Sequence, residues 1–170
     1  SMKNKKELAR ILEKLQGFEE PSMKDEQYST PADIAADVLW NAKMLGDLDG
    51  EDDTDTKEKS EKKEVLDLGC GSGILGIAAL LLDARSVLFL DKDESALAIC
   101  RKNLHLTDID DDRYVLVHEE IQSTDLRADL CLCNPPFGTK IKNADRIFLE
   151  KGMQSTILYF FHKTSTQDFI

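Results

Sequence analysis

The sequence predicts an α/β fold in which helices pack on both faces of a mostly parallel β-sheet. From Glu64 onward, short apolar runs alternate with longer segments of helical periodicity, a pattern typical of parallel sheets. The first apolar run ends in three alternating glycines, Gly69, Gly71 and Gly73, and an apolar helix follows. A glycine-rich turn between strand and helix is where such sheets bind ligands. We expect its backbone N–H groups to point freely at a ligand.

Each element of the sheet can be placed from its periodicity. Strands are expected over residues 64–68, 87–90, 114–117, 130–133 and 156–161. Helices are expected over residues 72–82, 94–106, 144–153 and 165–170. Because consecutive strands are joined by helices, we expect the strands to run parallel.

Two helices are expected before the sheet, over residues 3–15 and 31–45. The first has apolar residues at helical spacing, Leu8, Ile11, Leu12 and Leu15. In the second, Thr30 is a favourable N-cap with Pro31 at the first helical position. Its buried face is expected to comprise Ile34, Ala35, Val38, Leu39 and Trp40.

The segment between these helices and the sheet is rich in charge and poor in apolar side chains. We expect residues 46–63 to form an acidic, mobile loop, with a functional acidic segment as the alternative. The chain is thus divided into an N-terminal helical cap over the ligand site (1–45), this loop (46–63) and an α/β core (64–170), which together form one compact domain.

Composition narrows the class of protein. The chain has 170 residues and a net charge of −11, which argues against indiscriminate nucleic-acid binding. Residues 134–170 carry five bases and three acids, a balance compatible with binding of RNA.

The spacing of the four cysteines favours reduced core thiols over a zinc site or a disulfide. They are Cys70, Cys100, Cys131 and Cys133. No apolar run approaches the ~20 residues that span a bilayer, so we expect an intracellular protein without a membrane partner.

The glycine turn can be interpreted in two ways. Residues 71–76 fit the dinucleotide pattern G-x-G-x-x-G, which is weak alone. Asp67-x-Gly69-x-Gly71-x-Gly73 instead resembles the first motif of class I S-adenosylmethionine (SAM) methyltransferases, where the acidic residue faces the amino-acid end of the cofactor. Both interpretations require an acid after the next strand to bind ribose hydroxyls, and Asp91 occupies that position.

The loop after the fourth expected strand favours SAM. Asn134-Pro135-Pro136-Phe137 resembles the motif of methyltransferases that act on a planar nitrogen. There the Asn side chain and the first Pro carbonyl accept hydrogen bonds from the target amine, and the aromatic ring stacks on the base. The two prolines stiffen the loop, so catalysis would rest mainly on positioning.

Five motifs in order resemble the methyltransferase-like protein 5 family: Gly-Phe-Glu-Glu-Pro, Glu-Gln-Tyr-x-Thr-Pro, Asp-Leu-Gly-Cys-Gly-x-Gly, Asn-Pro-Pro-Phe-Gly-Thr-Lys and His-Lys-x-Ser. The resemblance implies a Rossmann-like, doubly wound class I methyltransferase that uses SAM to make N6-methyladenosine in small-subunit ribosomal RNA. The target base would be single-stranded or flipped out. The class I sheet usually has two more strands, paired antiparallel after the fifth. We expect this chain to lack that pair and favour a shortened chain as the reason.

The resemblance also assigns roles to individual residues. Gln27 and Thr30 would close over the cofactor, Gly69, Ser72 and Ile74 would line the turn, Asp91 would hold the ribose, and Glu120 with Ile121 would meet the adenine of SAM. Glu119 is a rival for Glu120. Asn134, Pro135, Pro136 and Phe137 would form the target-base site. His162 and Lys163 would line the RNA side, or would only end a strand.

Family members often require a small zinc-binding activator protein that pairs with the edge strand of the sheet, here residues 114–117. That apolar strand would be a liability if left bare. Alternative acceptors are a release-factor glutamine, guanine N2 and DNA adenine. Alternatives of a different class are an NAD-binding module and a catalytically idle adaptor.

Overall fold

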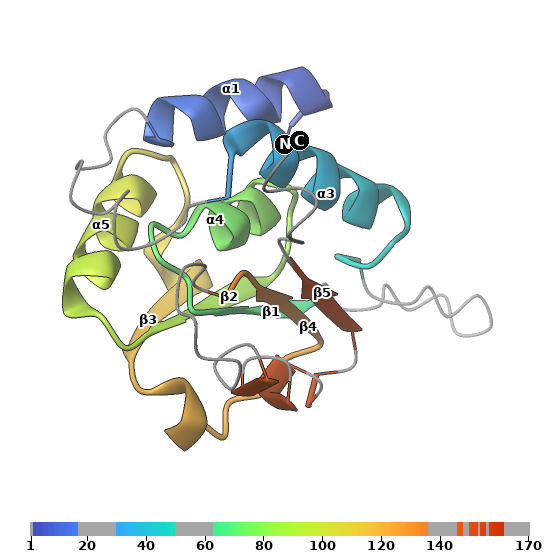
Figure 1. The fold of residues 1–170 in the computed structure, drawn as a ribbon. Helices are drawn as coiled ribbons and strands as arrows, with labels where there is room; N and C mark the ends of the chain where they lie inside the picture. The colour runs from blue at the N-terminus through green and yellow to red at the C-terminus, as the bar shows by residue number, and fades with distance from the viewer. Residues whose placement is uncertain are drawn as a thin grey trace, which may run out of the picture.

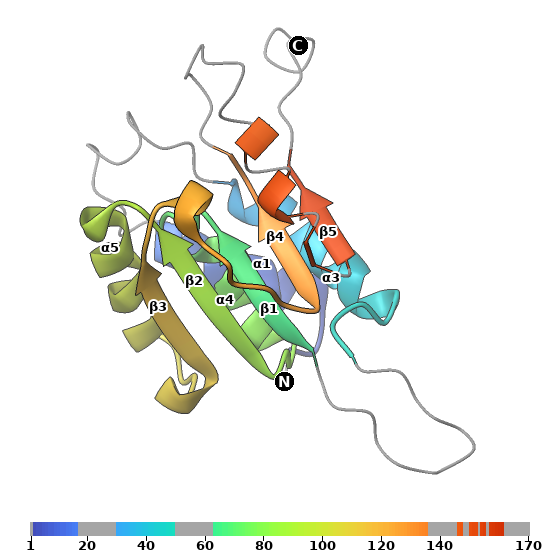
Figure 2. The same cartoon turned by 90° about the horizontal axis from the view of Figure 1, so that it is seen from below.

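The computed structural model describes residues 2–16, 30–49, 63–135, 146–147, 150–152, 154–155 and 157–161. Its centre is a sheet of five strands, β1 (Glu64–Leu68), β2 (Ser86–Asp91), β3 (Tyr114–His118), β4 (Leu130–Cys133) and β5 (Ile157–Phe160). The strands lie in the order β3-β2-β1-β4-β5, and every pair is parallel. Figure 2 shows β3 at one edge of the sheet and β5 at the other. The predicted parallel α/β fold is confirmed.

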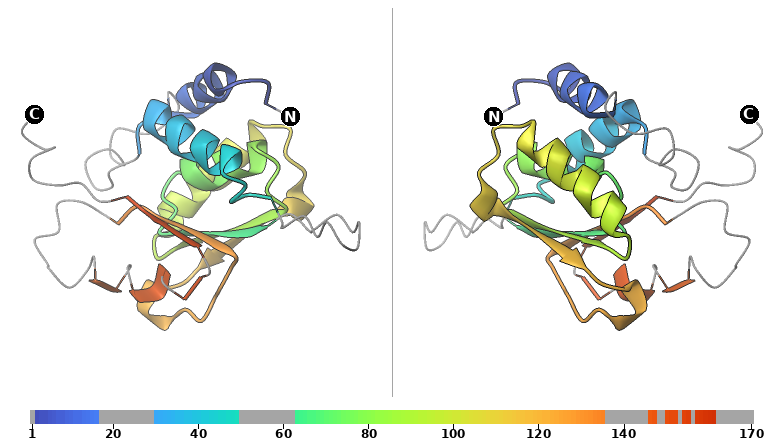
Figure 3. Two further views of the ribbon diagram at one scale, coloured as in Figure 1. Left: turned by 90° about the vertical axis from the view of Figure 1, so that its right-hand side faces the viewer. Right: turned by 90° about the vertical axis from the view of Figure 1, so that its left-hand side faces the viewer.

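The two faces of the sheet are covered unequally. Four helices lie on one side (Figures 1 and 3): α1 (Lys5–Gln16), α3 (Ala32–Met44), α4 (Ile74–Leu81) and α5 (Glu94–His105). In the described part of the chain, the other side carries the short 3₁₀ helix η2 (Ile121–Ser123) and helical residues at 146–147 and 150–152. A second 3₁₀ turn, η1 (Asp111–Arg113), precedes β3. The helix expected over residues 165–170 lies outside the described residues.

The strands are buried on both faces. Because successive side chains of a strand point to opposite faces, Val65, Val87 and Phe89 pack under the helices, and Leu66, Leu68 and Leu90 form a smaller cluster on the other side. This explains why the central strands read as continuous apolar runs rather than as alternating patterns.

Helix α3 packs through small side chains. Its buried residues are Ala32, Ala35, Ala36, Leu39 and Ala42. Ile34 is 46% exposed, so the prediction that it is buried is wrong. The alanine face lets α1 approach α3 closely, and α1 contributes Leu8, Leu12 and Leu15 to the same core. The helix therefore turns Ile34 away from the core.

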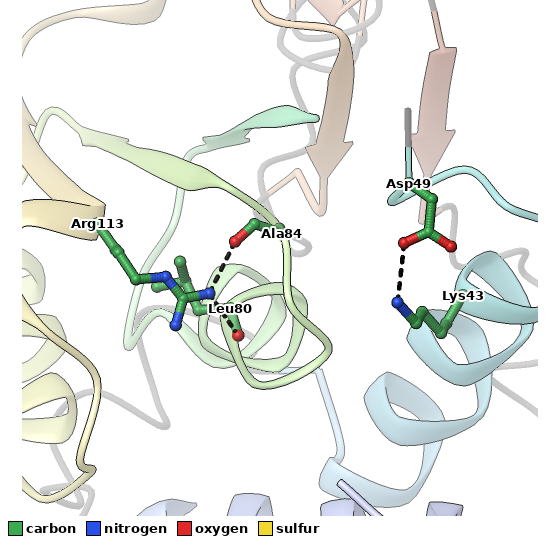
Figure 4. A network of polar contacts seen from close by, with 5 residues as sticks. All are labelled: Lys43, Asp49, Leu80, Ala84 and Arg113. Atoms are coloured by element: carbon green, nitrogen blue, oxygen red, sulfur yellow. Dashed lines mark hydrogen bonds and ion pairs between the residues drawn. The ribbon is translucent and has the colours of Figure 1, made fainter. Parts of the chain in front are cut away.

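Two polar contacts fix the ends of elements (Figure 4). The Arg113 guanidinium donates from one nitrogen to the carbonyl oxygens of Leu80 (2.9 Å) and Ala84 (2.7 Å). These carbonyls lie at and after the C-terminal end of α4, where a helix leaves acceptors without intrahelical partners. Lys43, in the last turn of α3, forms an ion pair with Asp49, which follows the helix (2.9 Å). Both contacts join an element to the segment that follows or flanks it.

All four cysteines lie in the described part of the chain, and each is a buried thiol. This confirms the expected core thiols. Of the helices that the structure describes, none is both long enough and apolar enough to span a bilayer.

Candidate functional site

The carboxyl ends of the three central strands meet at one edge of the sheet. Leu68, the last residue of β1, pairs with Leu90 of β2 on one side and with Cys133 of β4 on the other. The glycine turn, Asp91 and Asn134 follow these positions directly. The structure therefore brings the glycine turn, Asp91 and Asn134 together at the edge where open α/β sheets bind ligands.

The glycine turn adopts a backbone that favours glycine. Gly69, Gly71 and Gly73 have φ of 71°, 54° and 87°, in the left-handed region. The backbone nitrogens of Gly69 and Cys70 both donate to the carbonyl of Leu90, at 2.8 and 2.9 Å. The turn is thus fastened to the end of β2.

Two carboxylates accept the next backbone donors. Asp91 accepts from the nitrogens of Gly71 and Asp93, both at 2.9 Å. Asp67 accepts from the nitrogen of Gly76 at 2.9 Å, in the first turn of α4. The N-cap of α4 is Gly73, which has no side chain to satisfy that turn, so Asp67 does so from β1.

These bonds correct one sequence prediction. The backbone N–H groups of Gly69, Cys70, Gly71 and Gly73 all donate within the protein, the last to the carbonyl of Cys70. They do not point freely at a ligand as expected. The reason is that strand β2 and its terminal carboxylate lie close enough to use them first.

The carboxylates at this edge are strongly perturbed. Burial raises the pKa of Asp67 to about 8, with a smaller contribution from repulsion by Asp91, against the lowering effect of the Gly76 hydrogen bond. Burial also raises the pKa of Asp91, while its bonds to Asp93 and Gly71 lower it. Two buried acids at a ligand edge favour a positively charged group beside them.

This arrangement distinguishes the two cofactors that the glycine pattern left open. A pyrophosphate at the start of α4 would need free N–H groups, and it would meet Asp67 and Asp91 instead. SAM carries a sulfonium and an ammonium group, which suit buried carboxylates, and a ribose, which suits Asp91. The residues present fit SAM.

Asn134 is held from outside the sheet. Its Nδ2 donates to the hydroxyl oxygen of Thr30 at 2.6 Å, across 104 positions of sequence. Thr30 is 8% exposed. It is not the N-cap of α3 as predicted, because that position is Pro31, with no side-chain bond, and the Thr30 hydroxyl is engaged with Asn134.

Two functional neighbours were missed by sequence reasoning. Gln16 donates to the carbonyl of Thr30 (2.6 Å) and accepts from the nitrogen of Ala32 (3.0 Å). Asn103, 1% exposed on α5, donates to the carbonyl of Ser72 at 2.9 Å. A polar residue among the apolar residues of a helix could have drawn attention to Asn103. No spacing signals Gln16, whose partners lie 14 and 16 positions on.

Some of the remaining predicted residues are described by the structure, and others are not. Of those described, Glu120 is exposed, and four are buried: Ser72, Ile74, Ile121 and Pro135. The nitrogen of Glu119 donates to the carbonyl of Asp91 at 3.1 Å, so the segment around Glu120 and Ile121 lies beside the proposed ribose residue. Gln27, Pro136, Phe137, His162 and Lys163 lie outside the described residues.

Comparisons with known proteins agree with this geometry. The family model "Ribosomal protein L11 methyltransferase (PrmA)" matches residues 52–135. The chain is 35% identical over 172 residues to the rRNA N(6)-adenosine-methyltransferase metl-5 of Caenorhabditis elegans, covering 94% of this chain and 74% of that protein. It is 34% identical to the rRNA N(6)-adenosine-methyltransferase METTL5 of Danio rerio, covering 97% of this chain and 77% of that protein.

Solved structures show the same relationship. A crystal structure from Pyrococcus horikoshii, of a protein proposed to be an RNA methyltransferase, is similar with a TM-score of 0.75 and 35% identity. The similarity covers 99% of this chain and 77% of that one. The similarity therefore includes the N-terminal helices that hold Asn134 as well as the sheet.

Proposed function

This chain belongs to the rRNA N6-adenosine methyltransferase family, and we propose that it transfers a methyl group from SAM to adenine N6 in RNA, with small-subunit ribosomal RNA as the substrate. The observation that carries this proposal is the position of Asn134. It follows the central strand β4, beside the glycine turn, and its amide nitrogen is bonded to Thr30. With the nitrogen held there, the Asn134 oxygen is turned to the other side of the amide, where it can accept a hydrogen bond.

Adenine N6 needs help of this kind because its lone pair is delocalised into the ring. When bound, SAM supplies a methyl group made electrophilic by its sulfonium sulfur. Asn134 Oδ1 and the Pro135 carbonyl would accept hydrogen bonds from the two N6–H groups and localise the lone pair on nitrogen. After the methyl group is transferred, one N6 proton would leave to water. We propose that the ring of Phe137 stacks on the base and that Pro136 stiffens the loop before it. No strong base is required, since catalysis rests on positioning.

The cofactor side is assigned to the glycine turn and its neighbours. We propose that Asp91 binds the ribose hydroxyls and that Asp67 lies at the amino-acid end. Contacts to the rest of the cofactor are proposed for Gln27, Thr30, Gly69, Gly71, Ser72, Gly73, Ile74, Glu120 and Ile121. Burial of the two acids supports this, because a cationic ligand reduces their repulsion.

The test is methyl transfer to purified RNA. Small-subunit ribosomal RNA is incubated with this chain and SAM, and its nucleosides are analysed by mass spectrometry. We expect N6-methyladenosine with the native chain, and formation at least about a hundredfold slower with Asn134→Ala. Calorimetric titration of SAM into both chains supplies the control. Equal SAM binding with no methylated nucleoside from the native chain, either alone or with the activator protein proposed below, would contradict the proposal and favour an adaptor.

A protein acceptor is the second candidate, because the matched family model belongs to a ribosomal-protein methyltransferase. That match ends at residue 135, and it spans the glycine turn, Asp91 and Asn134 but not the predicted stacking ring Phe137. It therefore supports SAM use more than a choice of acceptor. Ribosomal proteins in a parallel reaction separate the two: methylated protein without methylated RNA would favour this candidate.

We also propose a small zinc-binding activator protein that pairs with β3. The strand is at the edge of the sheet, and Val115 is 55% exposed on it, an arrangement that invites strand pairing. Co-purification with a candidate activator should be lost in Val115→Pro, because proline breaks pairing. Full activity of a monodisperse isolated chain would contradict this proposal.

An intracellular location, cytoplasmic or nuclear, is proposed with it. The four buried thiols support a reducing compartment. Imaging of a tagged full-length protein tests it, and secretion would contradict it.

A further inference from the structure

We propose that Gln16, the last residue of α1, is a positioning residue for methyl transfer. It holds the backbone of Thr30, and Thr30 in turn orients the amide of Asn134. The inference rests on the proposed function, since it concerns the residue that would receive the target amine. It adds a residue that belongs to none of the recognised motifs.

The first step is the contact between Gln16 and the chain on both sides of Pro31. The Gln16 amide donates to the carbonyl of Thr30 at 2.6 Å and accepts from the nitrogen of Ala32 at 3.0 Å. Ala32 begins α3, so its N–H has no partner inside the helix. Pro31 restricts the backbone between the two contacts. Two bonds on one side chain therefore fix the position of Thr30.

The second step is the contact between Thr30 and Asn134. The Thr30 hydroxyl oxygen accepts from Asn134 Nδ2 at 2.6 Å. Thr30 is buried, so water competes little for this bond. The two residues are 104 positions apart in sequence, since Thr30 precedes α3 and Asn134 follows β4. The position of the Thr30 backbone therefore contributes to keeping them together.

The orientation of the Asn134 amide decides whether the site works. The oxygen and nitrogen ends of an Asn side chain are almost equal in shape but opposite in hydrogen bonding. With Nδ2 on Thr30, the oxygen is the end of the amide that a target N–H would contact. In the flipped orientation, an NH₂ group would face the amino group of adenine, donor against donor. Loss of Gln16 should therefore affect turnover more than cofactor binding.

Kinetics of three variants test this. Gln16→Ala removes both bonds, and we expect kcat to fall about tenfold while the Kd for SAM stays within about twofold. Glu13→Ala is the control, because Glu13 is exposed in the same part of α1 and should leave both constants unchanged. If Gln16→Ala does not fold, Gln16→Glu replaces it, because a carboxylate still accepts the Ala32 N–H.

Gln16→Glu also separates positioning from helix capping. An ionised carboxylate cannot donate to the Thr30 carbonyl, but a protonated one can, as the native amide does. Relative to the native chain, kcat of Gln16→Glu should rise as pH falls through the titration of this carboxyl. Capping alone predicts no such rise, because the acceptor for Ala32 is present in both forms.

A second readout does not depend on activity. The Asn134 side-chain amide gives an NMR signal that can be assigned by its loss in Asn134→Asp. We expect this signal to shift in Gln16→Ala and in Thr30→Val, and to stay in place in Glu13→Ala. If the native chain methylates no RNA, the proposed function fails, yet the NMR comparison still decides the inference. An unmoved signal in Gln16→Ala would overturn it, as would a kcat of Gln16→Glu that stays constant relative to native across pH.

Discussion

The glycine turn after β1 and the Asn134 segment after β4 lie at the same edge of the sheet, but they are held by different parts of the molecule. The turn is fastened by the Leu90 carbonyl, by Asp91 and by Asn103, all from β2 and α5. Asn134 is fastened by Thr30, which precedes α3. The glycine turn is thus held by the α/β core, whereas Asn134 depends on the segment before α3, from which Gln27 and Thr30 are also proposed to contact the cofactor. Changes at the turn should alter stability and cofactor binding together, and changes at Asn134 should alter turnover alone.

The largest effect is expected for Asn134→Ala, which tests the target side. Without the side-chain acceptor, kcat should fall at least about a hundredfold, while the Kd for SAM stays within about threefold because the turn is untouched. Rates of N6-methyladenosine formation and calorimetry measure the two constants. The matched variant is Asn134→Asp, which keeps an acceptor oxygen and should retain part of the rate. A large loss of SAM affinity in Asn134→Ala would break the separation between the two sides.

The same contrast explains what could be predicted from sequence. The strands, the turn and Asp91 are encoded locally, by short apolar runs, glycines and an acid at a strand end, and all appear where they were expected. The Thr30 hydroxyl was assigned to the N-cap of α3, because local pattern cannot show that Asn134, 104 positions away, competes for it. The burial predicted for Ile34 is wrong, and Gln16 is not predicted at all, for a similar reason. The packing of α1 on α3 decides which of their side chains point inward, and that is a tertiary property.

Asp91→Ala tests the cofactor side, and we expect it to raise the Kd for SAM about thirtyfold. The variant removes the proposed ribose acceptor and the partner of the Gly71 and Asp93 nitrogens, so it should weaken SAM binding by calorimetry. It should also lower the melting temperature, since two part-buried backbone donors lose this acceptor. Asp112→Ala is a control, because Asp112 is exposed in η1. Unchanged SAM affinity in a folded Asp91→Ala chain would remove Asp91 from the cofactor site.

Alanine substitutions at two glycines, Gly73 and Gly46, test whether packing against the core fixes the turn. Gly73 and Gly46 have φ of +87° and +81°, so alanine at either pays about 1 kcal/mol for its backbone. A Cβ on Gly73 would lie 2.5 Å from Cys100 Sγ, whereas one on Gly46 meets nothing within 4 Å. Overpacking should add about 2 kcal/mol at Gly73 alone.

Urea unfolding of both variants measures this difference. Cys100→Ala in the Gly73→Ala background should recover part of the loss, because it removes the sulfur that a new Cβ would strike. Equal destabilisation of Gly73→Ala and Gly46→Ala would mean that the turn yields freely, and the contrast with the Asn134 segment would lose its basis.

The last prediction concerns pH and Asp67, the most buried acid of the turn. Its pKa is about 8 in the folded chain against 3.8 for the ordinary carboxyl. Between these values the folded state binds a proton that the unfolded state has released. Stability therefore falls as pH rises from about 4 to about 8 and then levels off. Asp91, whose pKa is also raised by burial, contributes in the same direction.

Asp67→Asn should remove the larger part of this dependence while keeping an acceptor for the Gly76 nitrogen. The difference in melting temperature between pH 5 and pH 8.5 should thus be smaller in Asp67→Asn than in the native chain. If the difference is undiminished, the group that binds the proton is not Asp67.

Binding of SAM should also change the protonation of Asp67, because a cation beside Asp67 favours the ionised carboxylate. The native chain should release a proton on binding SAM near pH 7, seen as binding heats that change with the ionisation enthalpy of the buffer, and Asp67→Asn should not. The protonation of Asp67 in the core would then depend on the charge of the ligand. The orientation of the Asn134 amide depends instead on its contact with Thr30, before α3.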